Sequence, residues 1–217
     1  MIKGVIFDMD GLLIDSEPLW QEAEIETFTK VGVPLTKEMT KETMGLRVDE
    51  VVEHWFSRYP WKEPSKKEIG EKIIKRVIEL IKNKGMARKG VKEIIGFFTN
   101  QNIPIAIASS SQMEIIDAVL EKLSIRQHFK VIYSAENEPY GKPHPGVYIT
   151  TVKKLNINPE QCLAFEDSPN GVLAAKAAKV KCIAVPDEMV KDNKTFSIAD
   201  MVIDSLRDFR SEYLKQF

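Results

Sequence analysis

Four short apolar runs in the second half of the chain constrain its fold more than any other feature. Each run has the length of a β-strand, and a stretch with helical periodicity separates it from the next. The runs are IPIAIA (103–108), KVIYSA (130–135), CLAFED (162–167) and KCIAVP (181–186). Strands this apolar suit the buried interior of a parallel sheet, and their alternation with helices predicts a doubly wound α/β fold.

The segments around these runs complete the expected sheet. Helices are predicted at residues 91–102, 112–123, 145–156 and 168–180. A short edge strand at 201–203 should precede a C-terminal helix. Residues 2–7 (IKGVIF) form a further apolar run near the N-terminus, and we expect this first strand to join the same parallel sheet.

A block of helices interrupts the alternation after the first strand. Helical patterns cover residues 16–31, 36–43, 47–58 and 65–83, and no strand pattern lies among them. The first of these helices has Ser16 as its expected N-cap, before Glu17 and Pro18. We therefore predict a Rossmann-like core domain made of residues 1–15 and 85–217, with an inserted four-helix cap domain at 16–84.

The bulk composition limits the classes of partner. The 217 residues carry a formal net charge of −1, which does not suggest nucleic-acid binding. No apolar run approaches the roughly 20 residues that would span a bilayer, and no signal peptide is visible. We expect a cytoplasmic, monomeric protein that binds a small molecule, with no nucleic-acid or membrane partner.

Two carboxylates follow the first predicted strand. Asp8 and Asp10 stand two residues apart, so their side chains point the same way on an extended segment. Ligands of open α/β sheets bind beyond the carboxyl ends of the strands, which is where this pair should lie. The alternative is a pair of exposed turn residues, because Asp is common in turns.

Polar residues also follow three later strands or their loops. Ser109 and Ser110 precede a predicted helix, where hydroxyls and free amides can bind an anion or simply cap the helix. Lys142 lies in the turn-rich segment YGKPHP and could neutralise a phosphate, although loop lysines are usually solvated. Glu166 and Asp167 end another strand, where they could hold Mg²⁺ or favour the start of the next helix.

The order of these groups resembles the haloacid dehalogenase superfamily of aspartyl-nucleophile phosphotransferases. The resemblance extends from DMDGLLIDSEPLW to SPNG and covers essentially the whole chain. A helical insertion after the first motif is similar to the subgroup that includes β-phosphoglucomutase. Within it, LLIDSEPLW and GLRVDEVVEHWFSRYPW look most like hexitol phosphate and 2-deoxyglucose-6-phosphate phosphatases.

The resemblance implies roles for the residues of the predicted core. Asp8 would be the nucleophile, and Asp10 the general acid and base. Mg²⁺ would be held by Asp8, by the backbone carbonyl of Asp10 and by Asp167, with Glu166 close by, and Mn²⁺ or Co²⁺ are expected to substitute. The transferring phosphoryl group would be bound by Ser109, the Ser110 amide and Lys142.

The helical cap should close over the site and select the leaving group. Candidate substrate contacts are Glu17, Trp20, Arg47 and Lys72, although an aromatic such as Trp20 on an amphipathic helix more often packs in a core. β-Phosphoglucomutases have a His where this chain has Trp20, and an Arg where it has Val48.

These departures favour hydrolysis over mutase chemistry. We therefore expect a Mg²⁺-dependent phosphatase of small sugar phosphates that works through an aspartyl-phosphate. The alternative is a sugar phosphomutase using the same intermediate. A non-catalytic phosphate-binding receiver fits poorly, because receivers lack an inserted helical cap.

Overall fold

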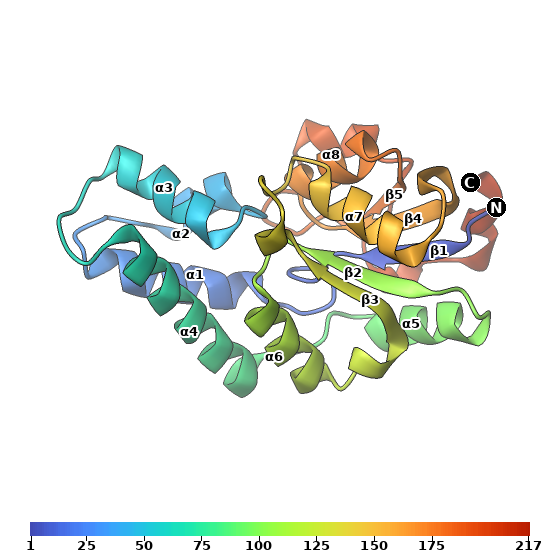
Figure 1. Cartoon of the computed structure of the whole chain (residues 1–217), viewed down its shortest axis with the longest axis horizontal. Coiled ribbons are helices and arrows are strands. Elements are labelled where there is room, and N and C mark those ends of the chain that lie inside the picture. The colour runs from blue at the N-terminus through green and yellow to red at the C-terminus, as the bar shows by residue number, and fades with distance from the viewer.

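A six-stranded parallel sheet forms the centre of the computed structural model, which describes all 217 residues (Figure 1). The strand order is β3-β2-β1-β4-β5-β6. The strands are β1 (Gly4–Phe7), β2 (Ile105–Ser109), β3 (Phe129–Ser134), β4 (Cys162–Glu166), β5 (Lys181–Ala184) and β6 (Met201–Val202). The doubly wound parallel sheet predicted from the sequence is confirmed.

Helices cover both faces of this sheet. In Figure 1, α5 (Val91–Asn100) and α6 (Met113–Leu123) lie below it, and α7 (Gly146–Leu155) and α8 (Pro169–Ala177) lie above it. Alternate residues of β1 point to opposite faces of the sheet and pack against the helices on each face, as strand geometry requires. Val5 and Phe7 belong to the same apolar cluster as residues of α5 and α6, whereas Ile6 belongs to the cluster that includes α7 and α8. Burial on both faces explains why the strands are apolar throughout.

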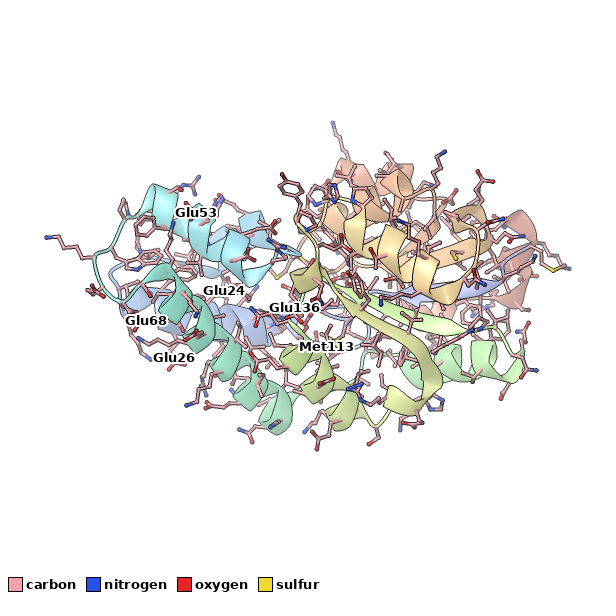
Figure 2. All side chains as sticks on the ribbon, viewed as in Figure 1. Glu24, Glu26, Glu53, Glu68, Met113 and Glu136 are labelled. Atoms are coloured by element: carbon pink, nitrogen blue, oxygen red, sulfur yellow. The ribbon has the colours of Figure 1, made fainter.

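Four helical segments follow β1 and form a separate lobe, at the left of Figure 1. They are α1 (Glu17–Thr29), α2 (Lys37–Thr40, continued by a 3₁₀ turn over Lys41–Thr43), α3 (Val48–Arg58) and α4 (Lys66–Lys84). The start of α4 is a capping box, in which Ser65 Oγ accepts from the Glu68 amide at 3.3 Å and the Glu68 carboxylate accepts from the Ser65 amide at 2.9 Å. Figure 2 labels Glu68 in this first turn. The four expected helices are therefore inserted after β1, the second of them short, and we refer to this lobe as the cap; its action as a separate domain stays a prediction.

The chain leaves the core and returns to it along two adjacent segments. The Asp15 amide donates to the Met86 carbonyl at 2.9 Å, and the Arg88 amide donates to the Leu13 carbonyl at 3.1 Å. Ile14 and Ala87 form an antiparallel bridge between the same two segments. The cap is therefore attached to the core through a paired, two-stranded connection.

The C-terminal segment differs from the prediction. It forms two short 3₁₀ helices, Leu206–Asp208 and Ser211–Gln216, in place of the expected α-helix. The ring of Phe209 packs 5.3 Å from that of Phe97 and 5.6 Å from that of Phe165. Docking of this aromatic ring beneath the sheet sets the path of the segment, which overrides the helical pattern. No helix of the chain has both the length and the apolar character needed to cross a membrane.

Candidate active site

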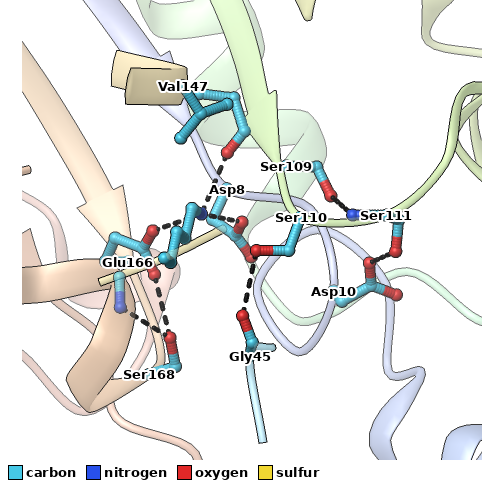
Figure 3. A network of polar contacts seen from close by, with 12 residues as sticks. Asp8, Asp10, Gly45, Ser109, Ser110, Ser111, Val147, Glu166 and Ser168 are labelled. Carbon is cyan, nitrogen blue, oxygen red and sulfur yellow. Dashed lines mark hydrogen bonds and ion pairs between the residues drawn. The ribbon is translucent and has the colours of Figure 1, made fainter. Parts of the chain in front are cut away.

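The carboxyl ends of the three central strands bring most of the predicted site residues together. Because β1 lies between β2 and β4, Asp8 sits between the ends of the other two strands. The Asp8 amide donates to the Phe165 carbonyl at 3.0 Å, which continues the sheet pairing beyond β1. Figure 3 shows Asp8 facing Glu166, with Ser109 and Asp10 on the other side of Asp8.

Lys142 is the cation of this site. Its Nζ donates to Asp8 Oδ1 at 2.5 Å, to Glu166 Oε1 at 2.6 Å and to the Ala108 carbonyl at 3.0 Å, and the residue is only 2% exposed. Burial alone would lower the pKa of Lys142, but the adjacent Asp8 and Glu166 carboxylates outweigh it and hold that pKa above its usual value. Lys142 is therefore a buried, permanently charged ammonium rather than a solvated loop residue.

Glu166 is also held by Tyr148 and closely surrounded by the backbone. The hydroxyl of Tyr148 donates to Glu166 Oε1 at 2.5 Å, on the same oxygen that Lys142 contacts. Glu166 is completely buried, and a side chain in place of Gly171 would collide with its carboxylate. These contacts fix the orientation of Glu166 and, through it, of the Lys142 ammonium.

A group of carboxylates beside Lys142 fits a divalent cation. Asp8, Glu166 and Asp167 can each present one oxygen within 4.8 Å of the others. Asp167 Oδ2 is buried without a hydrogen-bond partner. Burial and the charges of Asp8 and Glu166 raise the pKa of Asp167 well above its usual range, so this carboxylate requires further positive charge to remain ionised. Hard oxygen donors in such a cluster suit Mg²⁺-like ions.

Gly11 makes room for Asp167. The Gly11 backbone has a φ of +71°, and a Cβ at this position would lie 2.0 Å from Asp167 Oδ2. The glycine of the Asp-x-Asp-Gly motif therefore allows the chain after β1 to turn closely over the carboxylate cluster.

Asp10 lies in a different environment from Asp8. Its Oδ1 accepts from Ser16 Oγ at 2.8 Å and from Trp20 Nε1 at 2.9 Å, and its Oδ2 accepts from Ser111 Oγ at 2.7 Å. Ser16 and Trp20 belong to the start of the cap, and Ser111 belongs to the core. Three donors from both lobes thus orient the Asp10 carboxylate, away from the Lys142 ammonium.

The sequence did not reveal two of these three donors. Ser16 was expected to cap α1, but its side chain makes no capping hydrogen bond and donates to Asp10 instead. Ser111 is the third residue of a serine run in which Ser109 and Ser110 were the predicted ligands. Ser111 could have been identified from its place opposite Asp10. That place depends on the register of β1 against β2.

The other two serines are also at the site. Ser109 is buried at the end of β2, and its Oγ accepts from the Ser111 amide at 3.0 Å. The Ser110 hydroxyl donates to the carbonyl of Gly45 at 2.9 Å, which links the core to the cap (Figure 3). Ser110 therefore contacts the cap through its side chain, and binding of a phosphoryl group by its amide stays a prediction.

A cavity of about 50 Å³ lies between these residues and the cap. Its polar lining residues are Asp8, Asp10, Glu17, Gln21, Glu24, Thr40, Thr43, Ser109, Ser110, Ser111, Lys142, Asp167 and Ser168, joined by Trp20. A volume of this size holds only a few water molecules. The cavity in this structure is therefore smaller than a sugar phosphate.

Comparison with known proteins identifies the family. A family model described as haloacid dehalogenase-like hydrolase matches residues 5–185, from β1 to the end of β5. The chain belongs to this family. The resemblance inferred from the sequence is thereby confirmed.

Several relatives of this haloacid dehalogenase-like hydrolase have names that describe phosphatases. Hexitol phosphatase B of Escherichia coli K12 is 39% identical over 214 residues, which cover 98% of this chain and 96% of the relative. A protein of Thermotoga maritima named phosphorylated carbohydrates phosphatase is 32% identical over 205 residues, with 93% of both chains covered.

Solved structures of the family share the whole architecture. CbbY from Rhodobacter sphaeroides, determined in complex with phosphate, has a TM-score of 0.87 and 28% identity over 96% of both chains. A β-phosphoglucomutase from Clostridium difficile has the same TM-score with 25% identity, over 100% of this chain and 96% of the other.

Two predicted cap contacts lie outside the cavity of this haloacid dehalogenase-like hydrolase. Arg47 donates from Nη1 to the carbonyls of Ala135 and Glu138, at 3.2 and 2.8 Å, so its guanidinium fastens the cap to a core loop. Lys72 lies on the exposed side of α4, in a separate hollow with Lys30 and Arg76. The expectation that Arg47 and Lys72 contact a bound substrate is not supported, whereas Glu17 and Trp20 do line the cavity.

Proposed function

We propose that the chain is a phosphoric monoester hydrolase that releases phosphate from small phosphorylated sugars. The observation that carries this proposal is the separation of two carboxylates by environment. Asp8 faces a buried ammonium and a carboxylate cluster, and Asp10 is held toward the cap by three hydroxyl and indole donors. Such a division suits one carboxylate that attacks phosphorus and another that transfers protons. The names of the phosphatase relatives support the same activity.

In the proposed reaction, an Asp8 oxygen attacks phosphorus as the ester oxygen leaves. Asp10 gives a proton to that leaving oxygen, so the sugar departs as an alcohol and Asp8 carries an acyl phosphate. Asp10 then takes a proton from water, which attacks the acyl phosphate and releases inorganic phosphate. Lys142 and Ser109 would stabilise the equatorial phosphoryl oxygens, where phosphoryl transfer accumulates charge.

A divalent cation, which we propose to be Mg²⁺, fits the carboxylates beside Lys142. Asp8 and Asp167 would hold it, with Glu166 nearby and the backbone carbonyl of Asp10 as a further ligand. When bound, the ion supplies positive charge that offsets the repulsion between Asp8 and an anionic phosphate. The unpartnered Asp167 Oδ2 supports this assignment.

The cap side of the cavity favours hydrolysis over phosphomutase chemistry. A sugar phosphomutase has to bind a second phosphoryl group on the far side of the sugar. Lys142 is the only lysine or arginine that lines this cavity, and Lys142 belongs to the core. In addition, Trp20, which donates to Asp10, stands at the position where the mutases have a histidine. Both features support water as the phosphoryl acceptor.

We also propose that the chain consists of two domains that move relative to one another. Residues 16–84 would act as the cap and residues 1–15 with 85–217 as the core, closing on a substrate between them. Occurrence as a monomer in the cytoplasm, without nucleic-acid or membrane partners, stays a prediction.

The Asp8→Asn variant tests the function. We expect the parent protein with Mg²⁺ to release inorganic phosphate from at least one member of a panel of hexose and hexitol monophosphates, and Asp8→Asn to release none above background. The matched control is Asp117→Asn, because Asp117 is an exposed residue of α6 remote from the cavity. Turnover by the Asp8→Asn variant at the rate of the control would overturn the nucleophile assignment, and an inactive parent would overturn the function.

A further inference from the structure

Glu24 is a buried carboxyl group without a hydrogen-bond partner among the protein groups. It lies on α1, is 7% exposed and lines the cavity between cap and core. Two residues further along the same helix, Glu26 is exposed and pairs with Lys30 at 3.1 Å and Arg76 at 2.9 Å (Figure 2). A buried polar group left unpaired costs stability. Because Glu24 lines the cavity and bonds to no other side chain or backbone group, its carboxyl group is available to a ligand there.

The groups around Glu24 define the chemistry of such a partner. Gln21, one turn away on α1, directs Nε2 to Met189 Sδ at 2.8 Å, so its amide oxygen is available as an acceptor. Thr40 and Thr43 donate their hydroxyl protons to backbone carbonyls at 2.8 and 3.3 Å and retain acceptor capacity. The cap side of the cavity thus offers mainly hydrogen-bond acceptors and no cation.

Glu24 can donate as well as accept, and no protein group occupies its donor. Burial raises the pKa of Glu24 to about 8, so the carboxyl group carries a proton at neutral pH. A neutral carboxyl donates through one oxygen and accepts through the other, which matches the two roles of an alcohol group. A ligand with a second phosphate or a carboxylate would find no counter-charge on this side.

We propose that Glu24, with Gln21, Thr40 and Thr43, forms a subsite of the cap that binds hydroxyl groups of an uncharged leaving group, with Glu24 as the residue that determines specificity. This inference rests on the proposed phosphatase function and restricts its substrates to monophosphates of neutral sugars or polyols. The subsite favours leaving groups that carry hydroxyls and rejects leaving groups that carry a second anion.

The test compares three substrates on defined variants. The substrates are the best hexose or hexitol monophosphate of the panel, the 1,6-bisphosphate of the same sugar, and hexyl phosphate, which lacks hydroxyls. We expect Glu24→Leu to lower kcat/KM for the monophosphate by about tenfold or more, as expected for a lost hydrogen-bonding site. The kcat/KM of the same variant for hexyl phosphate should stay within about threefold of the parent value, because this substrate makes no hydrogen bond to Glu24.

Two further variants control for structure. Glu24→Gln keeps a donor and an acceptor and should retain most of the activity on the monophosphate. Glu26→Gln removes a carboxylate from the outer side of the same helix and should leave kcat/KM unchanged for both substrates. Equal loss on the monophosphate and hexyl phosphate in Glu24→Leu, or no loss on either, would overturn the subsite.

The unaltered protein supplies a measurement that does not depend on folding of the variants. We expect it to hydrolyse the 1,6-bisphosphate at least about tenfold less efficiently than the monophosphate, because a buried second phosphate would be uncompensated. A bisphosphate turned over as well as the monophosphate would overturn the inference while leaving the phosphatase function intact. A parent inactive on every ester would instead overturn the function itself.

Discussion

Replacement of Lys142 by methionine gives the most direct measure of the electrostatics of the site. Lys142 Nζ is the shared partner of Asp8 and Glu166, at 2.5 and 2.6 Å, and both carboxylates are buried. Methionine preserves the approximate length and volume of the side chain but removes the charge. Loss of one partner from a buried ion pair costs about 3–5 kcal/mol, because the remaining charge is left uncompensated. We expect Lys142→Met to lower the free energy of unfolding by about this amount at pH 7.5.

The cost should depend on pH in a defined direction. Burial raises the pKa of Asp8 and the charge of Lys142 lowers it, so the pKa of Asp8 rises further in the variant. A group whose pKa is higher in the folded state stabilises that state at low pH and loses this contribution as pH rises through the folded pKa. Because burial raises the pKa of Asp8 to about 8 in the parent, the contribution of Asp8 differs between the two proteins only above this pH, and the difference between parent and variant should be larger at pH 9 than at pH 7.5.

Urea unfolding followed by tryptophan fluorescence, in buffer without divalent cations, measures both effects. The control is Lys191→Met, since Lys191 pairs with Glu188 at a similar distance of 2.7 Å on the surface. An exposed pair contributes about 0–1 kcal/mol, so the control should unfold close to the parent. If Lys142→Met also unfolds within about 1 kcal/mol of the parent at pH 7.5, the uncompensated-charge argument is refuted.

Two further predictions concern the proton donor and the cation. Trp20→Phe removes the indole donor from Asp10, and we expect kcat for a sugar phosphate to fall about tenfold. The kcat of the same variant for p-nitrophenyl phosphate should stay within about twofold of the parent value, because this leaving group needs little protonation. An equal loss of kcat on both substrates would contradict the proposed action of Trp20 through Asp10. EDTA should abolish activity, and Asp167→Asn should raise the Mg²⁺ concentration for half-maximal activity by at least about tenfold. An unchanged Mg²⁺ requirement in a titration of Asp167→Asn would show that this carboxylate does not hold the ion.

The sequence was most informative where function follows from position along a strand. The apolar runs predict the sheet, and a doubly wound sheet brings the residues after β1, β2 and β4 to one edge. The sequence alone therefore places Asp8, Ser109 and Asp167 together. Lys142 follows no strand directly, and its placement rested on the family resemblance.

The cap could not be predicted to the same depth. Helical periodicity distinguishes a buried from an exposed face, but it does not say whether a buried polar residue faces a helix or a cavity. Glu24 and Glu26 look alike in the sequence, and only the packing of α1 against the core separates them. Arg47 and Lys72 lie outside the cavity for a related reason, since the contacts of a cap residue depend on how two lobes dock.

The paired connection between cap and core has a consequence for how such a protein changes over generations. The segment from Ser16 to Lys84 begins and ends at neighbouring points of one short ribbon, where Asp15 bonds to Met86 and Arg88 bonds to Leu13. A segment whose ends meet can be lengthened, shortened or exchanged without displacing the strands on either side. Selection can therefore alter the choice of alcohol through the cap, while Asp8 and its carboxylate neighbours remain where the sheet holds them.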